Sequence, residues 1–257
     1  MTSTLTASKP HNPLLAVVIT VFNESDNILP VCEELCTVLT DLPPAEVIIV
    51  DDGSTDTTQQ KLLEAKAHLL PQLRIIVHPT RMGKSAALRS AIRAAHAPWI
   101  ATMDGDGQDN PAFIQTMLAA RHTYETTHGV KSPAPLIVGV RRKRRDSFSR
   151  RFATRFANTL RQHLLHDHCP DTGGPLKLFQ RDLFLTLPHF EGLHRFLPAL
   201  MQSYGAPLIC IETQHRARLH GHSKYNNINR ALVGIFDLLG VLWLQKRTRP
   251  LPPLSER

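Results

Sequence analysis

The sequence predicts an α/β protein whose core is a mostly parallel sheet covered by helices. Three observations carry this prediction: short apolar runs alternate with helical segments through residue 140, the first run is apolar on both faces, and acidic clusters follow two of the runs. Such alternation is typical of parallel sheets, which bind ligands at the carboxyl ends of their strands. With 257 residues, 42% hydrophobic and 20% charged, the chain is unlike disordered or collagen-like proteins.

Strands and helices follow one another through the first half. Residues 14–22 are β-branched and apolar, which indicates a strand buried on both faces. Residues 23–26 supply capping side chains for a helix that runs to about Leu39, and residues 41–44 break that helix. The same pattern then predicts strands at 46–50, 74–77, 99–103 and 136–140, and helices at 55–69, 84–96 and 111–126.

The second half begins with a basic stretch at 141–145 that continues through Arg161. We expect about half of these basic residues to form a solvated helix face and the others to face an anionic acceptor. The elements predicted after this stretch are a strand near 176–179, helices at 182–187 and 196–204, a strand at 208–212, a polar loop to 226 and a C-terminal helix to about 245.

Lys and Arg outnumber Asp and Glu by 30 to 22, which gives a formal net charge of +8. This charge favours an anionic partner such as nucleic acid, anionic lipid or a phosphorylated small molecule, without choosing among them.

Of the four cysteines, only Cys32 and Cys36 are close in sequence, and their spacing places both on one helical face. We expect buried thiols there rather than a metal site.

The N-terminal segment to Pro13 is polar, and we expect no secretory signal peptide and a cytoplasmic protein.

The longest apolar run, 231–244, contains Asp237 and is shorter than the ~20 residues that a membrane-spanning helix needs. We expect it to form an amphipathic helix that lies on a membrane surface or packs on a partner helix, with Lys246, Arg247 and Arg249 available for anionic lipid. Packing on the protein's own sheet is the alternative.

An acidic cluster, Asp51 to Asp56, follows the second predicted strand. Carboxylates at this position suit hydrogen bonding to a nucleobase or ribose, and Gly53 permits close backbone approach. Capping of the next helix is the alternative. The first strand lacks a Gly-rich phosphate fingerprint, and Gly83-Lys84-Ser85 lacks the preceding glycine of a P-loop, which disfavours both of those nucleotide-binding classes.

A second acidic cluster, Asp104 to Asp109, follows the fourth strand. Asp104 and Asp106 can hold a hard divalent cation that keeps positions open for substrate phosphates, and Gln108 can add an amide oxygen. The alternative is an Asp-rich turn that caps the helix at Pro111. Because both clusters fall at one predicted sheet edge, a nucleoside diphosphate with a metal is the better interpretation.

Four motifs in this order resemble the family 2 glycosyltransferases with the GT-A fold. They are Val21-Phe22-Asn23-Glu24, Val50-Asp51-Asp52-Gly53-Ser54-Thr55-Asp56, Gly83-Lys84-Ser85-Ala86-Ala87-Leu88 and Asp104-Gly105-Asp106-Gly107-Gln108. The second half is similar to the polyprenyl-phosphate sugar transferases of the dolichol-phosphate mannosyltransferase type. The segments that carry this similarity are 139–141 with Arg144, Asp146, Arg150 and Asn158, then 171–177, 194–198 and 215–225. The resemblance covers residues 14–247.

The resemblance implies roles for individual residues. Asp51 or Asp52 would contact the base and ribose, and Asp104, Asp106 and Gln108 would bind Mg²⁺ or Mn²⁺. The catalytic set would be Asp104, Asp106, Asp171, Arg218 and Lys224; the further substrate-binding positions would be Val21, Asn23, Glu24, Gly83, Lys84, Arg141, Arg150, Thr154 and Ser223. Two positions depart from the family pattern, because Thr20 replaces a usual proline and Thr154 a common serine.

The function implied is an inverting, metal-dependent transfer of sugar from a nucleotide-sugar, GDP-mannose or a UDP-sugar, to a polyprenyl phosphate.

We expect a flexible segment at 1–13, a catalytic domain at 14–226 and a membrane- or partner-binding helix and tail at 227–257. The first part of that domain, 14–140, would bind the nucleotide-sugar, and 141–226 would bind the acceptor. The enzyme would be peripheral on the inner face of the cytoplasmic membrane. Several relatives carry transmembrane helices after this domain, and a small transmembrane protein could supply them here.

Two alternatives remain open. A family 2 transferase that uses a saccharide or lipid hydroxyl as acceptor would need a general base, for which Asp171 is the candidate. A non-catalytic basic module that binds RNA or a membrane would also explain the charge. Only 6% of the residues are aromatic, however, and the sequence carries no RNA-module motif, so we expect no nucleic-acid partner.

Overall fold

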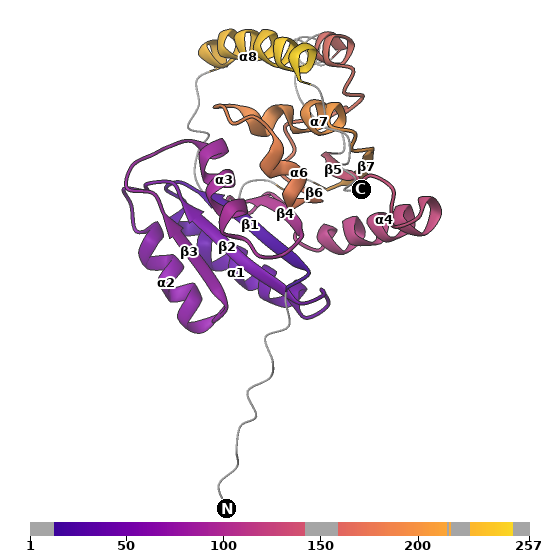
Figure 1. The fold of residues 1–257 in the computed structure, drawn as a ribbon. Helices are drawn as coiled ribbons and strands as arrows, with labels where there is room; N and C mark the ends of the chain where they lie inside the picture. The colour runs from indigo at the N-terminus through magenta and orange to yellow at the C-terminus, as the bar shows by residue number, and fades with distance from the viewer. Residues whose placement is uncertain (1–12, 142–158, 215, 217–226, 249–257) are drawn as a thin grey trace, which may run out of the picture.

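The computed structural model describes residues 13–141, 159–214, 216 and 227–248. A seven-stranded sheet forms its centre, in the order β3-β2-β1-β4-β6-β5-β7 (Figure 1). The strands are β1 (Leu15–Val21), β2 (Ala45–Asp51), β3 (Leu73–Val77), β4 (Trp99–Asp104), β5 (Leu136–Arg141), β6 (Lys177–Gln180) and β7 (Leu208–Thr213).

The sheet is mostly parallel, as the alternation of elements predicts. β1 pairs in parallel with β2 and β4, and β5 pairs in parallel with β7. The exception is β6, a strand of four residues that runs antiparallel to both β4 and β5. Because β6 lies between these two strands, it joins the first four strands to the last two.

Helices cover both faces of the sheet. Those described are α1 (Ser25–Leu39), α2 (Thr58–His68), α3 (Lys84–Ala94), α4 (Phe113–His128), α6 (Arg181–Thr186), α7 (Leu193–Ser203) and α8 (Asn227–Arg247). Side chains of α1, α2 and α4 pack with Val17 and Ile19 of β1 on one face. Side chains of α3, α6, α7 and α8 pack with Ala16 and Val18 on the other. β1 is therefore buried on both faces, as its apolar sequence predicts.

The C-terminal helix lies where the sequence predicts it and packs on the molecule by only one side. Val241 is fully buried and Leu238 is partly buried against the core. Phe236 and Trp243 point away from the core, with 73% and 60% of their surface exposed. In the part of the chain that the structure describes, no helix combines the length and apolar character needed to cross a membrane.

Gly53 fixes the turn that follows β2. Its φ of +73° is in the region that favours glycine, and a Cβ atom there would lie 2.6 Å from the backbone of Thr80 and Arg81. The segment around Thr80 can therefore approach the end of β2 only because residue 53 has no side chain.

We expect Gly53→Ala to destabilise the fold more than Gly129→Ala. Gly129 also has a positive φ, +84°, but a Cβ there would meet nothing within 4 Å. Both variants incur the backbone strain, about 1–3 kcal/mol, and Gly53→Ala adds an overpacking cost of a further ~1–3 kcal/mol. Urea unfolding followed by circular dichroism measures both free energies of unfolding. Equal losses in the two variants would contradict the close approach at Gly53.

Candidate active site

The two acidic clusters lie at the same edge of the sheet. In the register of the sheet, Val21 at the end of β1 pairs with Asp51 of β2, and Thr20 pairs with Asp104 of β4. Both acidic strand ends therefore flank the end of β1, where the sequence predicts that they meet. The loops that follow these three strands form the candidate site.

Asn23 and Glu24 join the loop after β1 to the loop after β2. The backbone N–H of Asn23 donates to Ser54 Oγ at 2.8 Å, and Asn23 Oδ1 accepts the Thr55 N–H at 2.7 Å. The Glu24 N–H donates to Thr58 Oγ1 at 2.9 Å. Asn23 has a φ of +52°, a conformation that asparagine tolerates better than most residues. These contacts keep the two loops together beside the site.

Asp51 and Asp52 are both almost fully buried, with different surroundings. Asp51 Oδ1 accepts the Ser54 N–H at 3.0 Å. Asp52 accepts the backbone N–H groups of Met82 and Gly83 at 2.9 and 2.8 Å, and Asp52 Oδ1 lies 2.8 Å from His78 Nδ1. Asp52 therefore fixes the segment 78–83 against the end of β2.

Asp104 is the last residue of β4, and Asp106 lies in the tight turn that follows. Lys84, the first residue of α3, forms an ion pair with Asp104. The backbone N–H of Asp104 donates to Asp109 Oδ2 at 3.1 Å, and Asp106 Oδ1 accepts the Gln108 N–H at 3.1 Å. Burial, and then the charges of Asp104 and Asp106, raise the pKa of Asp109 to about 7. The turn thus concentrates carboxylate charge beside one lysine.

The side chains of this turn fit a divalent cation. Asp104 and Asp106 supply hard oxygen donors, which Mg²⁺ and Mn²⁺ prefer, and Gln108 Nε2 is already used as a donor to the Arg216 carbonyl at 3.3 Å. Among the described residues, no three His, Cys, Asp or Glu side chains are grouped as a ready metal site. This donor set suits an ion that takes only one or two protein carboxylates and completes its shell with phosphate oxygens and water.

Arg141, at the end of β5, and Asp171 form a bidentate ion pair. In the sheet, β5 and β1 lie on opposite sides of β4. Arg141 Nε and Nη2 donate to Asp171 Oδ2 and Oδ1 at 2.6 and 2.8 Å. Burial acts to raise the pKa of Asp171, but the hydrogen bonds and charge of Arg141 outweigh it and lower that pKa. A carboxylate held in this way is a poor general base, which weighs against Asp171 activating a hydroxyl acceptor.

A small pocket lies beside the ion pair of Lys84 and Asp104. Its walls include Lys84, Asp104, Lys177, His194 and the segment 173–175. Burial, and then the charge of Lys84, lower the pKa of Lys177 to about 8, and Lys177 Nζ donates to the Gly174 carbonyl. A second positive group therefore lies near the carboxylates.

Sequence reasoning did not single out Lys177 and His194 as site residues. Both belong to segments that carry the family resemblance, 171–177 and 194–198, and that resemblance was the signal that could have identified them. His194 Nδ1 lies 2.9 Å from Ser85 Oγ at the start of α3. Five predicted site residues lie outside the described residues: Arg150, Thr154, Arg218, Ser223 and Lys224.

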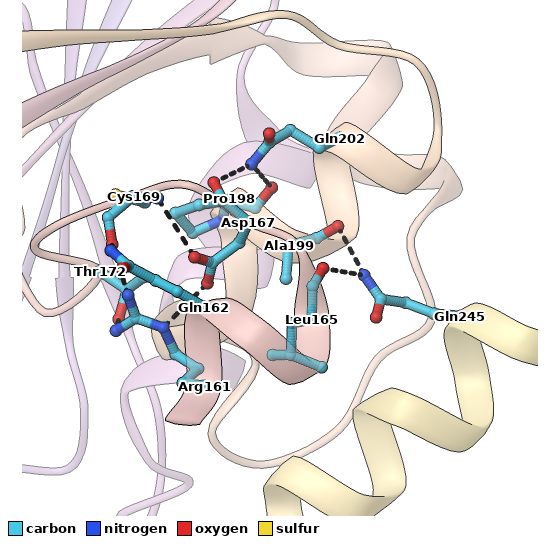
Figure 2. Close-up of polar contacts among 10 residues, drawn as sticks. All are labelled: Arg161, Gln162, Leu165, Asp167, Cys169, Thr172, Pro198, Ala199, Gln202 and Gln245. Carbon is cyan, nitrogen blue, oxygen red and sulfur yellow. Dashed lines mark hydrogen bonds and ion pairs between the residues drawn. The ribbon is translucent and has the colours of Figure 1, made fainter. Parts of the chain in front are cut away.

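A buried polar network holds the segment that leads into the pocket wall (Figure 2). Arg161 Nε lies 2.9 Å from Asp167 Oδ2, and Arg161 Nη1 donates to Thr172 Oγ1 at 2.9 Å. Gln202 of α7 donates to the Asp167 carbonyl at 2.6 Å, and Gln245 of α8 donates to the Leu165 carbonyl at 3.3 Å. The network therefore connects the pocket wall to both of these helices.

Comparison with known proteins identifies the family. The model of glycosyl transferase family 2 matches residues 16–187. The dodecaprenyl-phosphate galacturonate synthase of Rhizobium johnstonii is 32% identical over 92% of this chain and 69% of its own. The undecaprenyl-phosphate 4-deoxy-4-formamido-L-arabinose transferase of Edwardsiella ictaluri is 27% identical over 94% of this chain and 70% of its own.

A solved structure shares the fold at lower identity. Glucosyl-3-phosphoglycerate synthase from Mycobacterium tuberculosis, solved with Mg²⁺ and uridine diphosphate, superimposes with a TM-score of 0.65. It is 17% identical, and the match covers 91% of this chain and 79% of that one. The GT-A fold is thereby confirmed. The chain belongs to glycosyl transferase family 2, as its four motifs predict.

Proposed function

We propose that the protein transfers a sugar from a nucleotide-sugar to a polyprenyl phosphate, with inversion at the anomeric carbon. The observation that carries the proposal is the pocket in which Lys84 and Lys177 lie beside Asp104 at the carboxyl edge of the sheet. Two phosphate-bearing substrates need such positive groups to offset their mutual repulsion. The two relatives named above, whose names specify polyprenyl-phosphate acceptors, support this choice.

The reaction needs no strong base. The acceptor is a phosphomonoester with a second pKa near ~6, so it is largely dianionic at neutral pH. Its oxygen forms a bond to the anomeric carbon while the bond to the nucleoside diphosphate breaks. The protein has to hold the two anions in line and stabilise the leaving group. An Asp171 fixed by Arg141 agrees with this, because Asp171 then positions Arg141 and the pocket wall rather than accepting a proton.

For the donor, we assign the base and ribose contact to Asp51 in preference to Asp52. The carboxylate of Asp52 already contacts Met82, Gly83 and His78, so we assign it the role of holding the segment 78–83 in place. Asp104, Asp106 and Gln108 would hold Mg²⁺ or Mn²⁺, which supplies positive charge to the departing diphosphate. Lys84 would contribute a further positive charge to the same diphosphate. The resemblance assigns Arg150, Thr154, Arg218, Ser223 and Lys224 to the phosphate groups, and we retain that assignment as part of the proposal.

The exposed side of α8 is proposed to bind the surface of an anionic membrane. Ile235, Phe236, Leu239 and Trp243 are each more than half exposed on this helix, and Lys246 and Arg247 follow in its last turn. Apolar side chains beside basic ones are typical of helices that lie in the interface of anionic bilayers. Residues 227–257 would then bring the catalytic part, 14–226, to its lipid acceptor at the inner face of the cytoplasmic membrane.

A substrate panel tests the proposed reaction. The full chain is incubated with Mg²⁺ or Mn²⁺, a set of GDP- and UDP-sugars and either undecaprenyl phosphate or undecaprenol, and the lipids are analysed by mass spectrometry. We expect a glycosyl-phosphate lipid from undecaprenyl phosphate with one of the donors and no transfer to undecaprenol. Transfer to undecaprenol at a comparable rate would mean that the acceptor is a hydroxyl and that the proposal is wrong.

Substitution of the metal carboxylates tests their role. We expect Asp104→Asn and Asp106→Asn each to lower turnover by about 100-fold or more, because an amide binds a divalent cation poorly. Binding of Mn²⁺ with the nucleoside diphosphate, measured by electron paramagnetic resonance, should weaken in parallel. Asp182→Asn, an exposed site with the same charge change, is the control and should behave as wild type. Unchanged Mn²⁺ binding in both site variants would refute the assignment.

Liposome flotation tests the membrane surface of α8. We expect Phe236→Ser combined with Trp243→Ser to lower the bound fraction on anionic vesicles several-fold, because two large apolar side chains leave the interface. Leu63→Ser, at a leucine of α2 that is also more than half exposed, is the control and should float as wild type. If the double variant also floats as wild type, α8 is not the anchor. If the wild type does not float, a membrane partner is needed instead.

A further inference from the structure

His194 brings a third nitrogen-bearing side chain to the pocket that holds Lys84 and Lys177. It is the second residue of α7, and it lines the pocket together with these two lysines and Asp104. The proposed function gives roles to the two lysines and none to His194. An imidazole beside two lysines is suited to hydrogen bonding with an anion.

Ser85 fixes the ring of His194 in this position. Ser85 Oγ lies 2.9 Å from His194 Nδ1, and the same oxygen accepts the backbone N–H of His194 at 3.4 Å. Ser85 is 3% exposed and follows Lys84 directly at the start of α3. The ring of His194 is thereby held at a set place relative to the lysine that pairs with Asp104.

The contact with Ser85 decides which edge of the ring can meet a ligand. Because Ser85 Oγ accepts from the His194 backbone, its own hydrogen is available for Nδ1, and the proton of the neutral ring then resides on Nε2. In the charged ring Nε2 also carries a proton, and the hydroxyl turns to accept from Nδ1. Nε2 is therefore a hydrogen-bond donor in both charge states, which suits a phosphate oxygen.

The order of the strands places this pocket on the acceptor side of the site. Asp51 ends β2, Asp104 ends β4 and Lys177 begins β6, and the sheet order runs β2-β1-β4-β6. With the nucleobase at Asp51 and the diphosphate at Asp104, as proposed above, the donor enters from the β2 side. The pocket extends from Asp104 to Lys177, away from the base. The phosphate that reaches His194 is then that of the lipid.

We propose that His194 binds the phosphate of the lipid acceptor through Nε2, and that Ser85 positions its ring. The inference rests on the proposed function, because only a polyprenyl phosphate brings such a group to the pocket. This phosphate is largely dianionic at neutral pH and arrives beside the charge of Asp104. A donor at Nε2 offsets part of the repulsion and holds one phosphate oxygen while another attacks the anomeric carbon. His194 takes up no proton in this step.

Direct binding to the full chain tests this role. Farnesyl phosphate, a short polyprenyl phosphate, and farnesol are titrated separately by calorimetry, and UDP and GDP with Mg²⁺ serve as probes of the donor side. His194→Phe keeps a flat ring without nitrogen. We expect its affinity for farnesyl phosphate to fall about 10-fold, as for the loss of one hydrogen bond to a charged group. Its affinity for the nucleoside diphosphate should stay within about twofold of wild type.

Three further variants separate a phosphate contact from a structural role. His194→Gln retains an N–H near the position of Nε2, so its affinity for farnesyl phosphate should stay within about threefold of wild type. His194→Asn retains an N–H only near the position of Nδ1 and should lose as much as His194→Phe. His122→Phe, at an exposed histidine of α4, is the matched control and should bind as wild type.

Ser85→Ala tests the positioning of the ring. We expect a several-fold loss of farnesyl phosphate affinity in the wild-type background and no further loss when Ser85→Ala is added to His194→Phe, because Ser85 acts through that ring. Urea unfolding followed by circular dichroism identifies the variants that fold. Losses that add in the folded double variant would mean that Ser85 does not position His194.

The outcomes distinguish this inference from the proposed function. If the wild type binds farnesol as tightly as farnesyl phosphate, the acceptor phosphate is not recognised and both are wrong. If the wild type prefers farnesyl phosphate and folded His194→Phe binds it equally well, only the role of His194 is wrong. Equal losses of farnesyl phosphate and nucleoside diphosphate affinity in His194→Phe would also overturn that role, because the whole pocket would then have changed.

Discussion

The parallel pairing of β1 with β2 and β4 is the constraint on which the site depends. It brings the ends of three strands to one edge, so that residues far apart in sequence, Asp51 and Asp104, flank Val21. The loops after these strands can then be short, because the strands have already placed their ends. Gly53 permits the close approach of the segment around Thr80, and Asp52 holds that segment by hydrogen bonds.

The positive side chains of the candidate site have partners within the protein itself. Lys84 contacts Asp104, Arg141 contacts Asp171, and Lys177 donates to a carbonyl inside the protein. In the proposed reaction, phosphate groups that bind here would meet positive side chains that already have partners, so binding would exchange these contacts for new ones. Such an exchange costs less free energy than forming new ion pairs from hydrated groups, because Lys177 is already removed from water in the folded protein.

Patterns of apolar residues made most of the fold predictable, whereas contacts distant in sequence were not. Residues 14–22 carry enough β-branched side chains to specify a strand buried on both faces, and the structure has β1 there. The antiparallel direction of β6 was not predictable, because four residues carry no signal for direction. Lys177 was missed because a lysine is rarely buried, and only the three-dimensional structure shows its side chain enclosed.

The ion pair of Arg161 and Asp167 holds the segment before the pocket wall against α7, on which the C-terminal helix packs. A buried ion pair adds little net stability, but removing one partner leaves an unpaired buried charge at a cost of about 3–5 kcal/mol. Asp167 is completely buried, and its backbone carbonyl also accepts from Gln202. Few other conformations of this segment would give every one of these buried polar groups a partner. The segment before Asp171 therefore has one preferred position relative to α7, on which α8 packs through Val241. The helix with the exposed apolar side chains and the wall of the pocket are thus parts of one packed unit.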